Sequence, residues 1–344
     1  MDKYSLSYYD YYLPQDLIAQ KPLKDRDQSR MLVLNRNNGE IDHSHFKLLP
    51  EYLEEDNLLV LNDTRVIPAR LNGIIAEKEI AVELLLLHPT KSGKWMAMVK
   101  PGRKLKPGVR IELGLGYEAV IEDFGPDGLR IINFPSADPL SVILPKLGKV
   151  PLPPYIKAEV DDPEQYQTIY ATRDGSAAAP TAGFHFTEEM INTLQFKGVN
   201  TAFITLHIGP GTFQPVKTED IRKHVMHREY YKIDDSTVNI IRTTREKGKR
   251  IIAVGTTVCR VLETIAAHSN GNLERSEGWT DLFIYPGFKF QLVDAMLTNF
   301  HLPRSTLLML ISAFAGRDHV IRAYEDAVKE CYRFFSFGDC MLII

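Results

Sequence analysis

Short runs of apolar residues, separated by glycine, proline and aspartate, distinguish residues 71–150 from the rest of the chain. The runs fall at 80–87, 95–99, 109–113, 117–121 and 129–134. β-Rich runs with turn signals every 8 to 12 residues or so are typical of a small antiparallel sheet or barrel. We therefore predict an all-β domain in this part of the chain.

Helix-like and strand-like patterns alternate outside that stretch, in an order typical of α/β proteins. Helices are predicted at 188–196, 238–247, 257–267 and 318–333, and strands at 200–206 and 250–254. The predicted fold class is α/β plus all-β. A large mixed α/β catalytic domain of residues 1–70 and 151–344 is interrupted by an inserted, small antiparallel β-barrel domain at 71–150. The proline-rich residues 151–154 are interpreted as the stiff return between the two domains.

Composition sets only broad limits on the function. A chain of 344 residues exceeds the usual size of a single core, and 44% hydrophobic and 25% charged residues are typical of a globular protein. Cys259, Cys331 and Cys340 have no metal-ribbon or disulfide-framework spacing. The N-terminus lacks a secretory signal pattern, and the longest apolar run, 307–311, is too short for a bilayer. These features favour a cytoplasmic enzyme with no membrane partner, and the absence of a heptad pattern favours a monomer.

Three loops place a histidine beside hydroxyl, amide or aromatic residues. They are residues 179–187 (Ala-Pro-Thr-Ala-Gly-Phe-His-Phe-Thr), 207–213 (His-Ile-Gly-Pro-Gly-Thr-Phe) and 298–303 (Thr-Asn-Phe-His-Leu-Pro). Glycines in the first two loops permit unusual backbone angles and close approach to a ligand. We predict that the loops form one composite pocket, with these candidate residues: Pro180, Thr181, Gly183, His185, Phe186, His207, Gly209, Gly211, Thr212, Phe213, Asn299, Phe300 and His301.

Together with residues 62–70 (Asn-Asp-Thr-Arg-Val-Ile-Pro-Ala-Arg), 254–257, 283–287 and 332–339, these loops resemble the S-adenosylmethionine:tRNA ribosyltransferase-isomerase family of queuosine biosynthesis. The resemblance covers essentially the whole chain. It implies transfer and isomerisation of the ribosyl part of S-adenosylmethionine onto 7-aminomethyl-7-deazaguanine at the wobble position of a tRNA with a GUN anticodon. The implied products are epoxyqueuosine-tRNA, adenine and methionine. S-adenosylmethionine is then a substrate, and no cofactor or metal is implied.

Such chemistry requires a base that removes a proton from the carbon beside the positively charged sulfur. Histidine has a suitable pKa without tuning, whereas a carboxylate needs desolvation. The leading candidates are His207 and His185, followed by Asp63 and His301. For each histidine the alternative is a core imidazole whose nitrogens are satisfied by neighbouring groups.

The substrate suggests further roles by residue type. Adenine would stack on Phe186, Phe213 or Phe300, with its edge read by Asn62 or Asn299, and the alternative is that the aromatics fill the core. Arg65 and Arg260 would face a carboxylate or phosphate, and the methionine carboxylate suits Arg260 or the segment of Gly255, Thr256 and Thr257. Capping of a helix by either threonine remains an equal alternative. Thr64 belongs to the same candidate set through its motif.

Basic residues concentrate between His88 and Ile111, where no aspartate or glutamate occurs. Although the net charge of −3 argues against an overall basic surface, this local patch would suit RNA phosphates. The alternative is a solvated loop. The candidate RNA-binding residues are Lys91, Lys94, Lys100, Arg103, Lys104, Lys106 and Arg110.

Two further motifs are interpreted as not functional in the way they first suggest. Residues 112–116 (Glu-Leu-Gly-Leu-Gly) resemble a methyltransferase loop, but no helix follows, so a hairpin turn is predicted. His224, His227 and Glu229 lack the spacing of a helical zinc site, so no metal is predicted. Two other functions remain open at this point: a hydrolase or glycosyltransferase acting on a small nucleoside or nucleotide, and a noncatalytic RNA-binding module.

Overall fold

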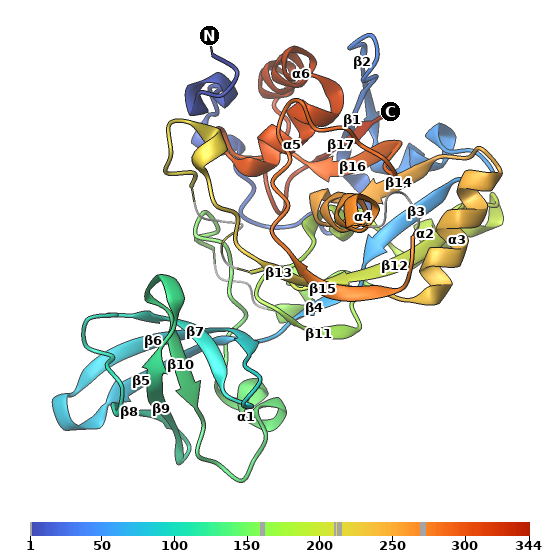
Figure 1. Cartoon of the computed structure of the whole chain (residues 1–344). Helices are drawn as coiled ribbons and strands as arrows, with labels where there is room; N and C mark the ends of the chain where they lie inside the picture. Colours follow the sequence, from blue (N-terminus) through green and yellow to red (C-terminus); the bar gives the residue numbers. More distant parts are fainter. Residues whose placement is uncertain (1, 159–161, 210, 212–214, 269–272) are drawn as a thin grey trace. The chain divides into compact units, whose positions relative to one another are not determined.

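The computed structural model describes residues 2–158, 162–209, 211, 215–268 and 273–344 (Figure 1). The chain forms two compact units. The larger unit comprises Met1–Thr64, Pro154–Arg173 and Pro180–Ile344, and the smaller one Arg65–Pro153 and Asp174–Ala179. The segment Asp174–Ala179 therefore belongs to the smaller unit, whereas the sequence pattern placed it in the larger domain. The predicted fold class, α/β with a closed antiparallel barrel, is confirmed.

The larger unit is built on a mixed sheet of nine described strands. Their spatial order is β15 (Ser276–Thr280), β13 (Glu229–Ile233), β12 (Asn200–Leu206), β3 (Leu58–Asn62), β14 (Ile251–Val254), β16 (Ala295–Asn299), β17 (Cys340–Ile343), β1 (Arg30–Leu34) and β2 (Ile41–His45). β12, β3, β14 and β16 run parallel to their neighbours in this group. Their carboxyl ends therefore meet at one edge of the sheet, where open α/β sheets bind ligands.

Helices and short 3-10 segments accompany the sheet. The α-helices of this unit are α2 (Glu188–Phe196), α3 (Asp235–Glu246), α4 (Thr256–His268), α5 (Thr306–Ala315) and α6 (Arg317–Lys329). The 3-10 segments are η1 (Leu6–Tyr9), η2 (Gln15–Leu17), η3 (Arg26–Gln28), η4 (Phe46–Tyr52), η7 (Pro163–Tyr166), η8 (Thr181–His185) and η10 (Ile221–Lys223). Within the described residues, no helix is both long and apolar enough to span a bilayer.

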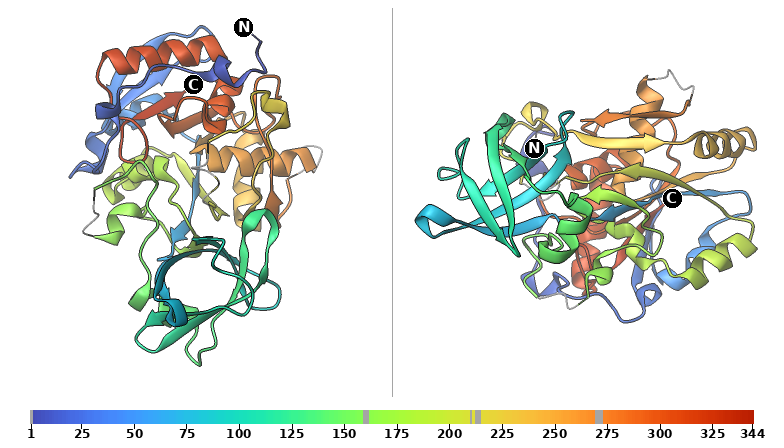
Figure 2. Two further views of the ribbon diagram at one scale, coloured as in Figure 1. Left: turned by 90° about the vertical axis from the view of Figure 1, so that its left-hand side faces the viewer. Right: turned by 90° about the horizontal axis from the view of Figure 1, so that it is seen from below.

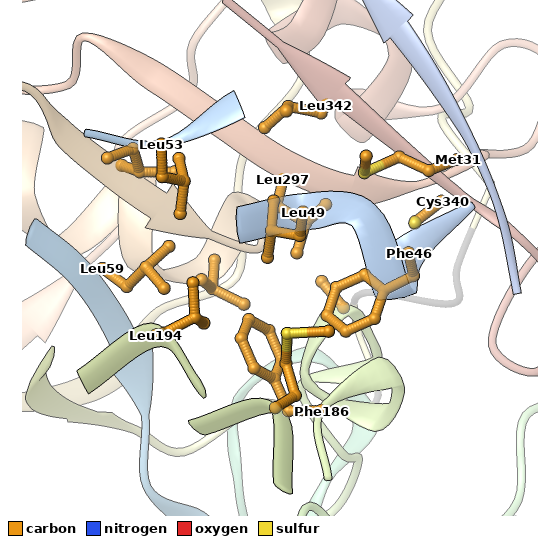
Figure 3. Close-up of a cluster of buried hydrophobic side chains, with 14 of the residues drawn as sticks. Met31, Phe46, Leu49, Leu53, Leu59, Phe186, Leu194, Leu297, Cys340 and Leu342 are labelled. Carbon is orange, nitrogen blue, oxygen red and sulfur yellow. The ribbon is translucent and has the colours of Figure 1, made fainter. Parts of the chain in front are cut away.

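A buried apolar cluster packs one face of the sheet against η4, η8 and α2 (Figure 3). Leu59 of β3 and Leu297 of β16 supply the sheet side, while Phe46 and Phe186 supply the opposite side. α2 begins where it does because the Thr187 side chain accepts a hydrogen bond from the Met190 amide at 3.1 Å, a favourable N-cap. This packing fixes η8, and with it the loop that carries His185.

The smaller unit is a closed antiparallel barrel in the order β10 (Arg130–Asn133), β7 (Trp95–Lys100), β6 (Ile80–Pro89), β5 (Arg70–Ile75), β8 (Arg110–Gly114) and β9 (Tyr117–Phe124). The ring of strands is visible in the left view of Figure 2. Alternate side chains such as Val82, Leu84 and Leu86 fill its interior. Its remaining elements are η5 (Ala76–Lys78), η6 (Pro126–Gly128) and α1 (Leu140–Leu147), and β4 (Thr64–Val66) and β11 (Arg173–Ser176) lie at the unit boundaries.

The turn between β8 and β9 confirms the prediction for residues 112–116. The two strands pair antiparallel, and Gly114, Leu115 and Gly116 have φ values of 95°, 52° and 81°. Positive φ at three successive residues is accommodated at low cost only where glycine is present, which explains the repeated glycines. The segment is a hairpin turn of the barrel and has no following helix.

Candidate active site

Candidate residues follow the carboxyl ends of all four parallel strands. Asp63 and Thr64 follow β3, His207 follows β12, Thr256 follows β14, and Asn299 ends β16. Strand pairing brings these segments to one edge of the sheet although they come from distant parts of the chain. The site is therefore assembled by topology, as in other open α/β sheets.

His207 is held against Thr64 and Tyr230. Its Nδ1 lies 2.7 Å from the Thr64 hydroxyl, and its amide donates to the Tyr230 carbonyl at 2.9 Å. The imidazole stacks on the Tyr230 ring with centroids 5.7 Å apart. His207 is half-buried, whereas Thr64 is fully buried. The tautomer in which Nδ1 donates to Thr64 makes Nε2 the basic nitrogen, so this contact orients a proton acceptor.

Asp63 lies beside Thr64 in the sequence and is 8% exposed. Its Oδ1 accepts a hydrogen bond from the Thr205 hydroxyl at 2.6 Å, and Arg173 Nε lies 3.6 Å from Oδ2. Burial raises the pKa of Asp63, and the Thr205 hydrogen bond and Arg173 only partly oppose the increase. A carboxyl group with a raised pKa can exchange a proton nearer neutral pH than an exposed aspartate can.

His185 is buried in η8 and satisfied on both ring nitrogens. Nδ1 lies 2.8 Å from the Ser29 hydroxyl and Nε2 lies 3.3 Å from Asn299 Nδ2. Burial, helped by the charges of Arg26 and Arg333, lowers the pKa of His185 to about 3. This geometry fits a core imidazole with satisfied nitrogens better than a catalytic base. The catalytic role of His185 stays a prediction.

His301 is also enclosed. Its Nε2 lies 2.8 Å from the Thr298 hydroxyl, its amide donates to the Tyr324 oxygen at 2.9 Å, and its carbonyl accepts from the Tyr11 hydroxyl at 2.5 Å. Burial lowers the pKa of His301 to about 3. A neutral ring that is fixed at this depth supports the loop, and nothing tests its predicted role as a base.

The aromatic candidates divide into buried and undescribed residues. Phe186 packs edge-on against Phe46 with ring centroids 5.0 Å apart, and Phe300 packs 4.9 Å from Phe334. Both phenylalanines are 0% exposed, so a ligand ring has no free face to stack on without opening the core. Their geometry favours the core-filling alternative. The candidates Thr212 and Phe213 lie outside the described residues.

Arg260 of α4 forms a buried ion pair with Glu229 of β13, and the two residues are 5% and 4% exposed. Arg260 Nε also donates to the Leu282 carbonyl at 3.2 Å, while its buried Nη2 has no acceptor among the described residues. Glu229 Oε1 accepts from the Gly209 amide at 2.9 Å. A substrate carboxylate at Arg260 Nη1 would therefore compete with Glu229.

The loop of residues 179–187 is tied to β16 through Thr181. The Thr181 hydroxyl donates to Asn299 Oδ1 at 3.2 Å, and the preceding Pro180 is buried. At Gly183 an added Cβ would lie 2.0 Å from Tyr170 Oη, and at Gly211 it would lie 2.2 Å from the His227 ring. These two glycines are required because side chains occupy the space where a Cβ would stand.

The remaining candidates lie at strand ends. Asn62 uses both ends of its amide on the Leu206 backbone, at 3.0 Å in each bond, and so ties β3 to β12. Thr256 is buried at the start of α4, while the Thr257 hydroxyl is buried and has no hydrogen-bond partner among the described residues. Arg65 belongs to the smaller unit. The amide of Asn62 is therefore occupied by contacts within the sheet.

The basic patch lies on the barrel and is only partly neutralised. Lys94 pairs with Glu122 at 2.7 Å and Arg110 with Glu118 at 3.5 Å. The other five cations are exposed, and none of them forms an ion pair with a described acidic residue: Lys91, Lys100, Arg103, Lys104 and Lys106. Four of these five lie in residues 100–108, the basic loop: Lys100 ends β7, and Arg103, Lys104 and Lys106 lie between β7 and β8.

Arg130 holds this basic loop in place. Arg130 is 7% exposed, and its guanidinium donates to the carbonyls of Leu105 at 2.6 Å and Gly102 at 2.7 Å. It also donates to the carbonyls of Gly128 and Leu129. Arg130 was not a candidate from the sequence, because nothing in the neighbouring sequence distinguishes a buried arginine from a surface one. Its contacts arrange the exposed cations before any ligand binds.

The described residues contain no group of three or more His, Cys, Asp or Glu side chains that could hold a metal ion. His224 and His227 therefore gain no additional ligand within the part of the chain that the structure describes. The prediction of no metal stays a prediction.

Comparison with known proteins identifies similar chains along nearly the whole length. The model of a family described as "Queuosine biosynthesis protein" matches residues 6–343. S-adenosylmethionine:tRNA ribosyltransferase-isomerases of Staphylococcus haemolyticus and Clostridium kluyveri are 53% and 51% identical over 98% and 97% of this chain and 98% of each relative. The crystal structure of S-adenosylmethionine tRNA ribosyltransferase from Thermotoga maritima is 42% identical, with a TM-score of 0.57, covering 98% of this chain and all of that one.

Proposed function

We infer that this chain, which belongs to the queuosine biosynthesis protein family, is a tRNA ribosyltransferase-isomerase. It transfers and isomerises the ribosyl moiety of S-adenosylmethionine onto 7-aminomethyl-7-deazaguanine at the wobble position of tRNA. The products are epoxyqueuosine-tRNA, adenine and methionine. The names of the relatives support this reaction over a small-substrate hydrolase or a noncatalytic RNA-binding module.

The observation that carries the chemical part of the proposal is the contact between His207 and Thr64. The sulfonium charge makes the proton on the neighbouring ribose carbon removable, and His207 Nε2 accepts that proton. Thr64 fixes the ring through Nδ1 at 2.7 Å, so the acceptor nitrogen has a defined direction. Because the two residues follow neighbouring parallel strands, the sheet itself positions the pair.

Asp63 has a second proton-handling role in the proposal. The adenine ring leaves more readily when one of its nitrogens is protonated, and burial raises the pKa of the Asp63 carboxyl toward the range where it can donate. The Thr205 hydroxyl holds Oδ1 at 2.6 Å, so Oδ2, which lies 3.6 Å from Arg173 Nε, is assigned as the exchanging oxygen. His207 and Asp63 are thus assigned as base and acid.

The RNA part of the proposal rests on the basic loop of residues 100–108. Arg130 arranges its backbone, and the exposed cations Lys100, Arg103, Lys104 and Lys106 contact phosphates of the anticodon arm. The partner is a tRNA with a GUN anticodon. We further propose that the enzyme acts in the cytoplasm as a monomer, with S-adenosylmethionine as a substrate and without a cofactor or metal.

The reaction is tested with S-adenosylmethionine labelled in its ribose, with and without tRNA that carries the aminomethyl-deazaguanine base. We expect label in the RNA together with an equal amount of free adenine. Adenine or adenosine release without tRNA would instead support a small-substrate enzyme. Binding of tRNA without any product from S-adenosylmethionine would support a binding module. The variant His207→Gln, folded and able to bind tRNA, is the control for a reaction that depends on this site.

A further inference from the structure

Three aromatic rings form a row on neighbouring strands at the edge of the sheet: His207, Tyr230 and Trp279. Tyr230 of β13 lies directly opposite Trp279 of β15, and the His207 amide donates to the Tyr230 carbonyl. The ring centroids are 5.7 Å apart for His207 and Tyr230, and 5.9 Å apart for Tyr230 and Trp279. Directly opposed residues of antiparallel strands share a face, so the row leads outward from the candidate base.

This aromatic row ends at the solvent-exposed Trp279, whereas the other face of β13 is buried. Trp279 is 39% exposed and Tyr230 is half-buried, whereas Glu229, Tyr231 and Ile233 on the other face of β13 are buried. An exposed tryptophan that continues a row from a candidate catalytic residue indicates a binding surface more than a packing requirement. Figure 1 shows β13 and β15 side by side at this edge.

The charges around the row are engaged with one another and include more acids than bases. Arg173 Nη2 lies 3.1 Å and Lys232 Nζ 3.8 Å from Asp234, and the Tyr230 hydroxyl donates to Glu277 at 3.1 Å. Asp63 adds a further carboxylate near Arg173. Phosphates are therefore poor ligands for this surface. The aromatic rings are the other groups of this surface, and the 39% exposed ring of Trp279 suits contact with a flat uncharged ring.

We propose that the row of His207, Tyr230 and Trp279 is a stacking platform for an unpaired base of the RNA, next in the strand to the base presented at His207. This inference rests on the proposed function. When the RNA anticodon loop places one unstacked base at His207, the adjacent nucleotide in the strand must leave the site nearby. Unpaired bases of single-stranded RNA are commonly bound by stacking on aromatic side chains. The platform then positions the anticodon loop at the larger unit.

The first test uses tryptophan fluorescence, because Trp95 and Trp279 are the two tryptophans of the chain. In a Trp95→Phe variant Trp279 is the single reporter. We expect quenching by an anticodon stem-loop RNA, but not by a duplex of the same stem without the loop. A Trp279→Phe variant, which reports from Trp95 alone, is the matched control. An unchanged Trp279 signal at saturation, with binding verified by filter retention, would overturn the proposal.

The second test separates the RNA base from S-adenosylmethionine as the ligand of the platform. We expect Trp279→Ala to raise KM for tRNA by roughly ten-fold, as for loss of one stacked base, and to leave KM for S-adenosylmethionine unchanged. Phe196→Ala, which removes an aromatic residue 96% exposed on α2, should change neither constant. A rise confined to KM for S-adenosylmethionine would show that the platform holds adenine or the sulfonium cation, contrary to the proposal. Because the fluorescence test requires no turnover, it remains decisive if the proposed reaction fails.

Discussion

The two units of this protein present their candidate functional groups in opposite ways. The larger unit collects Asp63, Thr64 and His207 from distant segments at the ends of parallel strands, and most groups around them are buried and hydrogen-bonded. The smaller unit presents its cations within one continuous loop, exposed and fixed mainly through backbone carbonyls bound by Arg130. Substitutions at the strand ends of the larger unit should therefore strongly affect turnover or stability. Substitutions in the basic loop of the barrel should change the affinity for tRNA by small amounts that depend on salt.

The largest effect is expected from His207→Gln, which removes the proposed base. Turnover should fall by about 10²- to 10⁴-fold, as for loss of general base catalysis, while the thermal unfolding midpoint stays close to that of the wild type. Adenine release and calorimetry measure the two quantities. His185→Gln is the matched variant, and it should mainly lower the unfolding midpoint because its ring bonds Ser29 in the core. If His185→Gln instead abolished turnover while His207→Gln mainly lowered the unfolding midpoint, His185 would be the base and His207 the structural residue.

The next largest effect is expected in stability when the buried ion pair is broken. Glu229→Gln leaves the Arg260 charge buried without its partner and should lower the free energy of unfolding by ~3–5 kcal/mol in urea titrations. The exposed barrel pair offers the contrast, since Glu122→Gln removes the partner of Lys94 and should cost about 0–1 kcal/mol. The double variant Glu229→Gln with Arg260→Met should recover much of the loss. Equal losses of unfolding free energy for Glu229→Gln and Glu122→Gln would refute the distinction between buried groups of the larger unit and exposed groups of the barrel.

A smaller effect for each pH unit is expected from the two buried histidines. Burial lowers the pKa of both His185 and His301 from 6.5 to about 3, so between these values the unfolded chain binds protons that the folded chain does not. The free energy of unfolding should therefore fall as the pH decreases below 6.5, by up to ~1.4 kcal/mol per pH unit for each ring.

Asp63 and Asp339 act in the other direction, because burial raises their pKa values. The pH measurement is therefore the difference in urea midpoints between the wild type and the variant His185→Gln with His301→Gln. This difference should change with pH between 6.5 and 4. A difference that is constant with pH would show that the two rings titrate normally in the folded protein.

The smallest effect is expected from single cations of the basic loop. Lys104→Ala should weaken tRNA binding a few-fold and reduce the slope of log affinity against log salt by about 0.7–0.9, the value for one lost phosphate contact. Lys94→Ala should change the slope less, because Lys94 is already paired with Glu122. Binding at several salt concentrations gives both slopes. Identical slopes for the wild type and Lys104→Ala would remove this residue from the interface.

The sequence pattern predicted local elements well where local signals determine them. α2 and β12 have the predicted bounds, 188–196 and 200–206, because a threonine cap and a helix-ending glycine flank the helix. Five of the six barrel strands were also predicted, whereas β5 was missed. The strands β1, β16 and β17 were missed because both of their faces are buried, so their residues are apolar without alternation. α5 was read only as an apolar run for the same reason.

The candidate site was predictable as a set of loops but not as a set of roles. A histidine in a glycine-containing loop looks the same whether its partner is Ser29, which is 156 positions from His185, or a substrate. Glu229 and Arg260 likewise carry no local sign that they form a pair. Roles depend on burial and on contacts between distant segments, and these arise only when the sheet is assembled.

The position of β17 has a consequence for biosynthesis. This strand lies inside the sheet between β16 and β1, and its Cys340 pairs with Met31 of β1. On the ribosome, the barrel can close once β10 has been made at residue 133, whereas β1 must wait until residues 340–343 emerge. Throughout that interval the apolar strand β1 is paired only with β2, and its other edge waits for β17, as in other slowly completed sheets with nonlocal pairing. The nascent chain thus carries a finished barrel and an unfinished sheet whose open strand edge is exposed to aggregation.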